Sequence, residues 1–344
     1  MITRVLESLV EVLLKRIRGE IVMCTTIGFS YKEGIVFGRT LEVGMPLDNH
    51  ILFVPKNLEG FIQTVETDFS SKYAVLGTGF FNQPSFGDGI NEMGLMGSNN
   101  LYPGYASFAT RPVEDKINLT IAPAFNYLLS RCKNVEEIRV ESKKMNILAE
   151  GKSKDDVSTE QHFFFMDAEG NGIVLQPNDG QLLIHDNPYG VLTNAPEFPW
   201  HVTNLRNYIH LHPENVQQNI MNGVSLSKFG EGSGMVGLPG DFTPPSRFIR
   251  AASFVSATPK DLERNEAILQ GFRILSQADI PTGAVINPIE RHRDETLYTS
   301  IMDTKKKAYF IKFHDNINIQ PFYLDEYKDE KEVVFLNIEK TMNL

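Results

Sequence analysis

The sequence predicts an α+β fold in which antiparallel sheets are covered by helices. Expected strands come in runs, followed by helices and then by strands again, and not in alternating β–α–β units. The chain has 344 residues, of which 42% are hydrophobic, enough to bury a sizeable core. No internal repeat or low-complexity linker divides it. We therefore predict a single domain over residues 24–344, preceded by a separate segment, 1–23.

The first strands are expected to form a hairpin. Segments 24–31 and 34–43 flank the turn sequence "KEG", which is typical of a tight β-connection. Further strands are expected at 50–56 and 72–80, and a pair of strands is expected around the turn at 91–94.

Helices and strands then follow in blocks. Helices are predicted over 122–132 and 134–150, the second from an apolar stripe that includes Val135, Ile138 and Val140. The remaining expectations are a hairpin at 161–177, strands at 181–186 and 190–196, helices centred on 246–257 and 261–277, a hairpin at 296–315 and a last strand at 332–338.

Composition narrows the classes of function. The net charge is −10, and no block of Lys or Arg is longer than 305–307, which argues against a nucleic-acid partner. No apolar run reaches the ~18–20 residues of a membrane span. Glu7 and Glu11 interrupt the N-terminal apolar segment, whereas a signal peptide has a continuous apolar region. With only two cysteines, Cys24 and Cys132, we expect a reducing, cytoplasmic location.

Cys24 is the candidate nucleophile. A thiol becomes reactive when a neighbouring group takes its proton, and histidine is the usual helper. None of the eight histidines stands in a recognisable Cys/His protease pattern, and His162, His210 and His212 are read as surface or satisfied core residues. A free α-amino group on Cys24 itself would serve, because its pKa of about 7.7–8.0 lies near working pH. This mechanism requires removal of everything before Cys24. Cys132 is interpreted as a packing cysteine.

Several stretches together resemble the choloylglycine hydrolase and penicillin V acylase family of N-terminal-nucleophile hydrolases. They are "MCTT", "FGRTLE", "KYAVLGTG", "DGINEMGLMGSNNLYPGY", "GVLTNAPEFPWHVTNLRNY", "GSGMVGLPGDFTPPSRFIRAA" and "LYTSIMD", in family order from residue 23 to about 303. The resemblance implies a four-layer αββα sandwich whose first strand presents Cys24. It implies no metal or organic cofactor.

The resemblance also implies roles near the thiol. Arg39 of "FGRTLE" would favour the thiolate, although alone it could be an ordinary strand-end arginine. Glu42 stands where the family usually has aspartate near the α-amino group, so the charge is kept and the reach differs. Asn194 of "LTNAP" matches the oxyanion-hole asparagine, and otherwise reads as a turn residue. The second oxyanion donor, a backbone N–H, falls on Leu101, where relatives carry tyrosine or asparagine.

Two more residues come from "GDFTPPSRF". Arg247 matches an active-site arginine that would organise the charges around Cys24. Alternatively, it lies in the first turn of a helix capped by Ser246 or a neighbour, where a cation is poorly placed. Asp241 either supports this region or is a turn residue, and both interpretations stay open.

Three explanations compete for residues 1–23: a propeptide removed autocatalytically, a retained amphipathic helix, or translation that starts at Met23. We favour the third, because Arg18-Gly19-Glu20 can be encoded by a purine run that resembles a ribosome-binding site. Loss of one methionine would then expose Cys24. If the segment were retained, the same fold would be a non-catalytic binder of acyl ligands.

The expected substrate is a small N-acyl amide. We expect penicillin V acylase-like activity, which "SQADIPTGAV" and "FPWHVTNLRNYI" favour. The stretch "NLYPGY" favours the alternative, a conjugated bile salt hydrolase. By resemblance alone we also expect a homo-oligomer, a tetramer.

Overall fold

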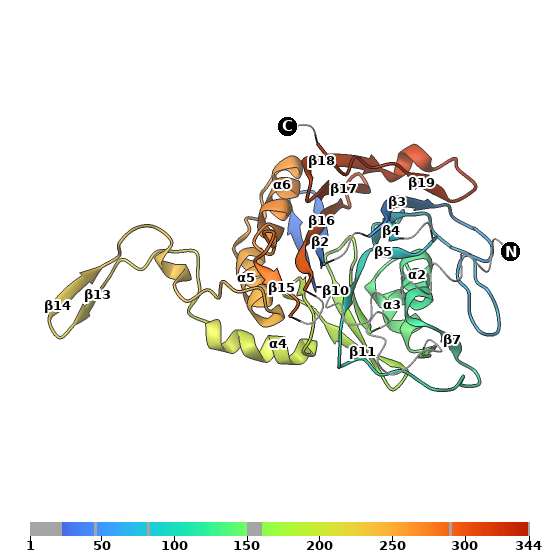
Figure 1. The fold of residues 1–344 in the computed structure, drawn as a ribbon, viewed down its shortest axis with the longest axis horizontal. Helices are drawn as coiled ribbons and strands as arrows, with labels where there is room; N and C mark the ends of the chain where they lie inside the picture. Colours follow the sequence, from blue (N-terminus) through green and yellow to red (C-terminus); the bar gives the residue numbers. More distant parts are fainter. Residues whose placement is uncertain (1–22, 45–46, 81–82, 150–159, 289–290, 343–344) are drawn as a thin grey trace.

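A computed structural model describes residues 23–44, 47–80, 83–149, 160–288 and 291–342. Two antiparallel sheets stack face to face, and a pair of helices covers the outer face of each (Figure 1). The predicted four-layer αββα sandwich is therefore confirmed. The interpretations of residues 1–22 concern a segment outside the described residues.

The first sheet is built around the hairpin of β1 and β2. Its strands, in spatial order, are β12 (Val191–Leu192), β1 (Met23–Tyr31), β2 (Gly34–Val43), β16 (Arg293–Asp303), β17 (Ala308–Phe313) and β18 (Asn316–Tyr323), with β15 (Val285–Ile286) paired to β16. Tyr31 lies opposite Gly34 and Met23 opposite Glu42, so the hairpin has a two-residue turn. This register brings the start of β1 beside the second half of β2.

The second sheet has helices on one face and the first sheet on the other. Its order is β11 (Gln181–Asp186), β10 (Gly172–Asn178), β9 (Gln161–Met166), β6 (Met96–Leu101), β5 (Phe86–Asn91), β4 (Val75–Phe80), β3 (Asn49–Val54) and β19 (Val334–Leu336). Phe164 packs into the core that includes the space between the sheets, whereas Phe163 and Phe165 pack beneath the helices. A strand covered on both faces is apolar throughout, which explains this run of phenylalanines.

The covering helices are α5 (Pro244–Ala257) and α6 (Arg264–Leu275) on the first sheet, and α2 (Ile121–Arg131) with α3 (Val135–Ser142) on the second. The side chain of Asn134 accepts the backbone N–H of Glu137 and so fixes the start of α3. Among the residues that the structure describes, no helix combines the length and apolar character that crossing a bilayer requires.

The helix predicted over 134–150 is wrong in its second half. It ends at Ser142, and the chain continues as β8 (Met145–Ile147), parallel to β7 (Ile117–Leu119). Met145 and Ile147 are buried in the core beneath the helices, whereas Val140, assigned to the apolar stripe, is exposed. A short strand whose three residues are all buried was thus mistaken for the second half of a helix.

The predictions also omit the last strand of the first sheet and an exposed hairpin. β18 follows β17 at the edge of the first sheet, and β13 (Gln218–Met221) pairs with β14 (Val224–Ser227) in an arm that extends from the body after α4 (Phe198–Leu205) (Figure 1). The arm turns on Asn222 and Gly223, both with positive φ, the conformation that an Asn-Gly hairpin turn requires.

Candidate active site

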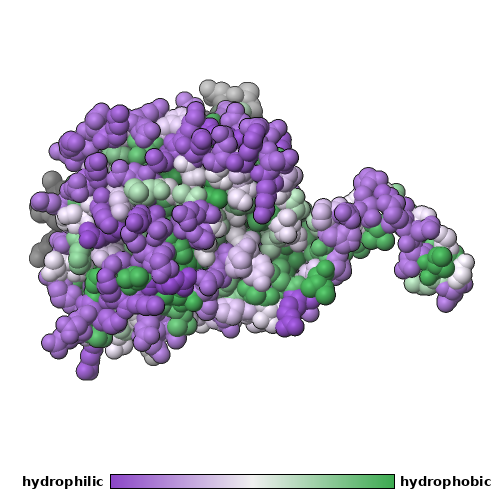
Figure 2. Space-filling model, turned by 180° about the vertical axis from the view of Figure 1, so that it is seen from behind, coloured by the Kyte–Doolittle hydropathy of each residue, from purple (hydrophilic) through white to green (hydrophobic). Residues whose placement is uncertain are grey.

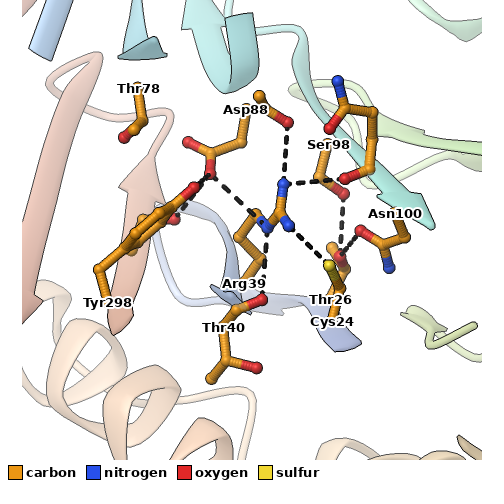
Figure 3. A network of polar contacts seen from close by, with 12 residues as sticks. Cys24, Thr26, Arg39, Thr40, Thr78, Asp88, Ser98, Asn100 and Tyr298 are labelled. Carbon is orange, nitrogen blue, oxygen red and sulfur yellow. Dashed lines mark hydrogen bonds and ion pairs between the residues drawn. The ribbon is translucent and has the colours of Figure 1, made fainter. Parts of the chain in front are cut away.

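Cys24 lies near the start of β1, with its side chain facing Arg39 of the neighbouring strand. The Arg39 guanidinium donates from Nη2 to Cys24 Sγ at 2.8 Å (Figure 3). Both side chains are buried, each residue being 1% exposed. The geometry brings together the thiol and the arginine that the sequence analysis had named.

The rest of the guanidinium is held by the protein interior. Nη1 donates to the carbonyls of Gly87 (3.0 Å) and Asn99 (2.8 Å), and Nε donates to that of Thr40 (3.3 Å). These bonds fix the plane of the guanidinium, so that Nη2 is the edge presented to sulfur.

The thiol is nevertheless not acidic in this environment. Burial raises the pKa of Cys24, and this outweighs the opposing effect of Arg39, the backbone N–H of Leu101 and Arg247. Glu42 raises it further. A buried thiol of this kind needs a proton acceptor before it can attack a carbonyl.

Asn194 lies just after β12 and contacts the nucleophile residue directly. Its Oδ1 accepts the backbone N–H of Cys24 at 3.1 Å, and its Nδ2 donates to the Leu101 carbonyl at 2.8 Å. The Leu101 backbone N–H lies close enough to the thiol to lower its pKa. The two predicted oxyanion donors, the Asn194 amide and the Leu101 backbone, are thus both beside Cys24.

Arg247 projects from the first turn of α5 towards β1. Nη1 donates to the Cys24 carbonyl (2.6 Å) and to Thr25 Oγ1 (2.7 Å), and Nη2 donates to Asn194 Oδ1 (2.7 Å). Nε donates to the carbonyl of Phe242. These acceptors hold the Arg247 cation at the positive end of α5. The bond from Arg247 to Oδ1 in turn determines which way the Asn194 amide points.

Asp241 supports this region through the start of α5. Its carboxylate accepts the backbone N–H of Thr243 (2.9 Å) and the hydroxyls of Thr243 (2.5 Å) and Ser246 (2.6 Å). Hydrogen bonds from Ser246 and Thr243 hold the pKa of Asp241 at about 2. Both open interpretations therefore apply, since Asp241 orders the turn that presents Arg247.

Glu42 is fully buried on β2, opposite Met23 on β1 and Thr296 on β16. Oε1 accepts the Thr296 hydroxyl at 3.5 Å, and Oε2 has no hydrogen-bond partner among the described residues. Burial raises the pKa of Glu42 to about 7, against the opposing effect of Arg247. A cation near Oε2 would therefore be strongly favoured.

Asn100, which was not among the predicted site residues, links three parts of the site. Its Oδ1 accepts the hydroxyl of Thr26 on β1 at 3.0 Å. Its Nδ2 donates to the carbonyls of Leu192 (3.3 Å) and Thr193 (3.0 Å), next to Asn194 (Figure 3 labels Asn100 and Thr26). Asn100 therefore ties the strand of Leu101 to the strands of Cys24 and Asn194.

Two buried histidines hold the backbone around Asn194. His162 Nε2 hydrogen-bonds to the Thr193 carbonyl at 3.0 Å and His201 Nε2 to the Asn194 carbonyl at 3.0 Å. Burial lowers the pKa of His162 to about 3 and that of His201 to about 4, so both rings are neutral near pH 7. The interpretation of His162 as a satisfied core residue is confirmed. His201 had no recognisable signal in the sequence.

No cluster of three or more His, Cys, Asp or Glu residues arranged to hold a metal occurs in the described part of the chain. The second cysteine, Cys132, is fully buried beneath the helices of the second sheet. Its interpretation as a packing residue is confirmed.

Comparisons with known proteins find relatives along most of the chain. The profile of "linear amide C-N hydrolases, choloylglycine hydrolase family" matches residues 24–334. A bile salt hydrolase/transferase from Clostridium perfringens is 33% identical over 94% of this chain and 99% of its own. A crystal structure of a variant conjugated bile acid hydrolase from the same organism superposes with a TM-score of 0.84 at 31% identity, covering 93% of this chain and 99% of that one.

The expected preference for penicillin V is less well supported than its alternative. A penicillin V acylase from Pectobacterium atrosepticum is only 22% identical, over 84% of this chain and 76% of its own. A match of the profile over most of the chain, together with the relatives above 30% identity, identifies the reaction as hydrolysis of a linear amide C–N bond. The chain is an enzyme of the choloylglycine hydrolase family.

Proposed function

We propose that this enzyme hydrolyses the amide bond of conjugated bile acids. The observation that carries the proposal is the 33% identity to a bile salt hydrolase/transferase along almost its whole length, against 22% to a penicillin V acylase. The stretch "NLYPGY" (100–105) supports it, because it resembles a stretch typical of bile salt hydrolases.

In the proposed mechanism, Cys24 is the nucleophile and its own α-amino group is the base. The amine takes the thiol proton, sulfur bonds to the amide carbonyl carbon, and the carbonyl π electrons move to oxygen. The raised pKa of the buried thiol supports this assignment, because Arg39 alone does not make the sulfur ionise.

The oxyanion would be stabilised by Asn194 Nδ2 and the Leu101 backbone N–H. Both groups are next to Cys24, and a donor of this kind is worth about 2.7–4 kcal/mol in the transition state. The C–N bond then breaks as the amine leaves with the proton of the α-ammonium. Water, deprotonated by the same amine, hydrolyses the thioester and frees the sulfur.

Three charged residues would arrange the charges around these steps. Arg39 favours the thiolate, and Arg247 orients Asn194 through its bond to Oδ1. Glu42 lies opposite Met23, the residue before Cys24, in the pairing of β1 with β2. Its unpartnered Oε2 therefore suits the α-ammonium of Cys24.

This mechanism needs Cys24 at the N-terminus of the working enzyme. The hydrogen bond from the Cys24 nitrogen to Asn194 Oδ1 supports it, because an α-amine at that position would find an acceptor. Intact mass and N-terminal sequencing of protein made from the native gene would test it. An amide-hydrolysing form with any residue before Cys24 would refute it. An uncleaved form that only binds acyl ligands would favour the non-catalytic alternative.

The substrate is tested by assaying one preparation on glycocholate and on penicillin V at equal concentrations. We expect the higher kcat/KM on glycocholate. Higher kcat/KM on penicillin V would overturn the substrate assignment and leave the amide hydrolase activity intact.

The arm supports the proposal of a homo-oligomer, a tetramer by resemblance. Ile220, Val224 and Phe229 on the arm are 67%, 59% and 112% exposed. Figure 2 shows hydrophobic surface near the end of the arm, away from the body. Exposed apolar residues on an extension commonly pack against another chain. Light scattering should give about four times the mass of one chain as determined by mass spectrometry, and this should decrease to one chain mass when 218–227 is replaced by a short glycine linker.

We also propose the cytoplasm as the location. Both cysteines, Cys24 and Cys132, are free and buried, which fits a reducing compartment. Cell fractionation that finds the enzyme outside the cytoplasm would contradict this.

A further inference from the structure

A buried carboxylate lies behind Arg39, on the side away from the thiol. Asp88 of β5 is fully buried, and its Oδ2 is 3.8 Å from Arg39 Nε (Figure 3). The guanidinium therefore faces Cys24 Sγ with Nη2 and faces Asp88 with Nε. The proposed mechanism assigns no role to this acid.

Hydroxyl donors surround the carboxylate. Tyr298 donates to Oδ2 at 2.9 Å, Ser300 lies 3.4 Å from the same oxygen, and Tyr309 donates to Oδ1. The acid comes from the second sheet and its hydroxyl partners from the first, so the cluster bridges both sheets (Figure 3 labels Asp88 and Tyr298). Burial raises the pKa of Asp88, and Arg39 together with the three hydroxyl donors opposes this. Because a carboxylate can only accept hydrogen bonds, these converging donors favour its ionised form.

Arg39 needs such an anion. Apart from the thiol, the hydrogen-bond acceptors of its guanidinium are the neutral carbonyls of Thr40, Gly87 and Asn99. Burial would lower the pKa of Arg39, and its neighbours Cys24, Tyr298, Asp88 and Glu42 raise it instead. A buried cation without a counter-charge is strongly destabilising, so the position of Asp88 has a physical reason.

We propose that Asp88 is a positioning residue for the hydrolysis: it acts through the Arg39 guanidinium and determines how strongly that cation stabilises the Cys24 thiolate. The proposal rests on the proposed function of Cys24. The competing explanation is purely structural, namely that the cluster only joins the two sheets. The two explanations differ in their effect on the thiol, because only the first couples the Asp88 charge to sulfur through Arg39.

Asp88→Asn tests the coupling, because it keeps the shape and removes the charge. The readout is the pH dependence of Cys24 alkylation by iodoacetamide, followed by mass spectrometry of the peptide that carries Cys24. Removing a negative charge behind Arg39 leaves more positive potential at the sulfur. The alkylation midpoint, which belongs to the coupled thiol and amine, should therefore move to lower pH, by about one unit. We also expect kcat to fall by about threefold with little change in KM, because a thiolate of lower pKa is a weaker nucleophile.

The chain offers a matched control at the other end of the same strands. Asp303 is also fully buried and accepts from a tyrosine, Tyr31 (2.6 Å), and an arginine, Arg264 (2.6 Å). Tyr31 is seven residues from Cys24 along β1, or roughly 23 Å at the rise of a strand. Asp303→Asn should lower stability, and it should leave the alkylation midpoint and kcat near those of the unmodified enzyme.

A second variant keeps the test decisive if Asp88→Asn folds poorly. Arg39→Met leaves Asp88 without its cation, and the double variant Arg39→Met/Asp88→Asn removes both charges. We expect the double variant to be at least as stable as Arg39→Met, with the same kcat and the same alkylation midpoint.

The positioning role is refuted if Asp88→Asn behaves like Asp303→Asn, or if Asp88→Asn lowers the alkylation midpoint equally with and without Arg39. Alkylation needs no substrate, so these results can be read even if the bile acid assignment fails. Conversely, hydrolysis that survives in Cys24→Ala would refute the proposed function, whatever Asp88 does.

Discussion

The two cysteines of this chain are both buried and free, yet their surroundings differ completely. Cys24 is next to a guanidinium, an amide side chain and a backbone donor. Cys132 is packed among apolar residues after α2, and burial together with Glu141 and Glu137 raises its pKa. Burial raises the thiol pKa at both positions, so the polar neighbours, and not depth, distinguish a candidate nucleophile from a core residue.

Each cysteine also has an asparagine beside it, and the two asparagines are used differently. Asn91 Nδ2 donates to the carbonyls of Leu129 and Cys132, and its Oδ1 accepts two backbone N–H groups of its own turn. Asn194 instead links the Cys24 nitrogen, Arg247 and the Leu101 carbonyl. The first asparagine joins a turn to a helix end, whereas the second joins the groups that would carry the chemistry.

The largest effect should come from replacing each of the two cysteines by alanine in turn. Cys24→Ala should remove all measurable amide hydrolysis, because the protein loses its nucleophile, and should cost only about 1 kcal/mol of stability through the small cavity left behind. Cys132→Ala should retain kcat. Turnover of glycocholate and thermal unfolding of both variants would check this. Residual hydrolysis in Cys24→Ala, or its loss in Cys132→Ala, would contradict the distinction.

The next effect concerns the asparagines. Asn194→Ala should lower kcat by about 10²–10³-fold, because one oxyanion donor is lost. Asn91→Ala is the matched control: it should cost about 1–3 kcal/mol of stability for each backbone group left unpaired, with kcat retained. Steady-state kinetics and chemical denaturation separate the two outcomes. Equal effects of both variants on kcat would show that Asn194 acts only through structure.

Much of the fold and of the site could be predicted because the informative residues are local in sequence. "KEG" marks the first hairpin, and "FGRTLE" and "LTNAP" carry Arg39 and Asn194 within short stretches. The arm was missed although Met221-Asn222-Gly223-Val224 contains an Asn-Gly turn signal, because the flanking strands are exposed and lack a buried face. That hairpin could have been found.

Other residues had no local signal. Asn100 contacts Thr26, 74 residues away, and Asp88 contacts Tyr298, 210 residues away, so their roles arise only when the sheets stack. In the sequence, His201 is one polar residue in a helix. Its role follows only from the hydrogen bond between its ring and the Asn194 carbonyl. Sequence patterns indicate which strand carries a residue, but not which strand of the opposite sheet it will face.

The comparison extends to the acids near each thiol. Burial holds the pKa of Glu42 near 7, whereas Glu141, close to Cys132, has a lowered pKa because Lys144 and Tyr127 outweigh its partial burial. Between pH 4.5 and 7, a folded chain that retains Met23 binds the Glu42 proton more tightly than the unfolded chain does. The free energy of unfolding should therefore decrease as pH rises through this window, by about 3 kcal/mol in total from this group.

Glu42→Gln should remove that decrease, and denaturant titrations at pH 4.5, 6 and 8 would measure it. The control Glu141→Gln should act in the opposite sense, because a lowered pKa stabilises the fold above the normal pKa of the acid and the variant loses that contribution. Parallel pH profiles for wild type and Glu42→Gln would show that Glu42 is already ionised in the folded chain.

The smallest effect is expected at the packing cysteine itself. Cys132→Ala removes one sulfur atom from a fully buried site and should cost about 1 kcal/mol through the small cavity left behind. Cys132→Ser should cost more, because its hydroxyl would need a hydrogen-bond partner in apolar surroundings, whereas Cys24→Ser places the hydroxyl beside the Arg39 donor. Urea denaturation of the four single variants gives the comparison directly. If serine is tolerated equally at both positions, the polar neighbours of Cys24 do not distinguish the two sites energetically, and the contrast between the two cysteines fails.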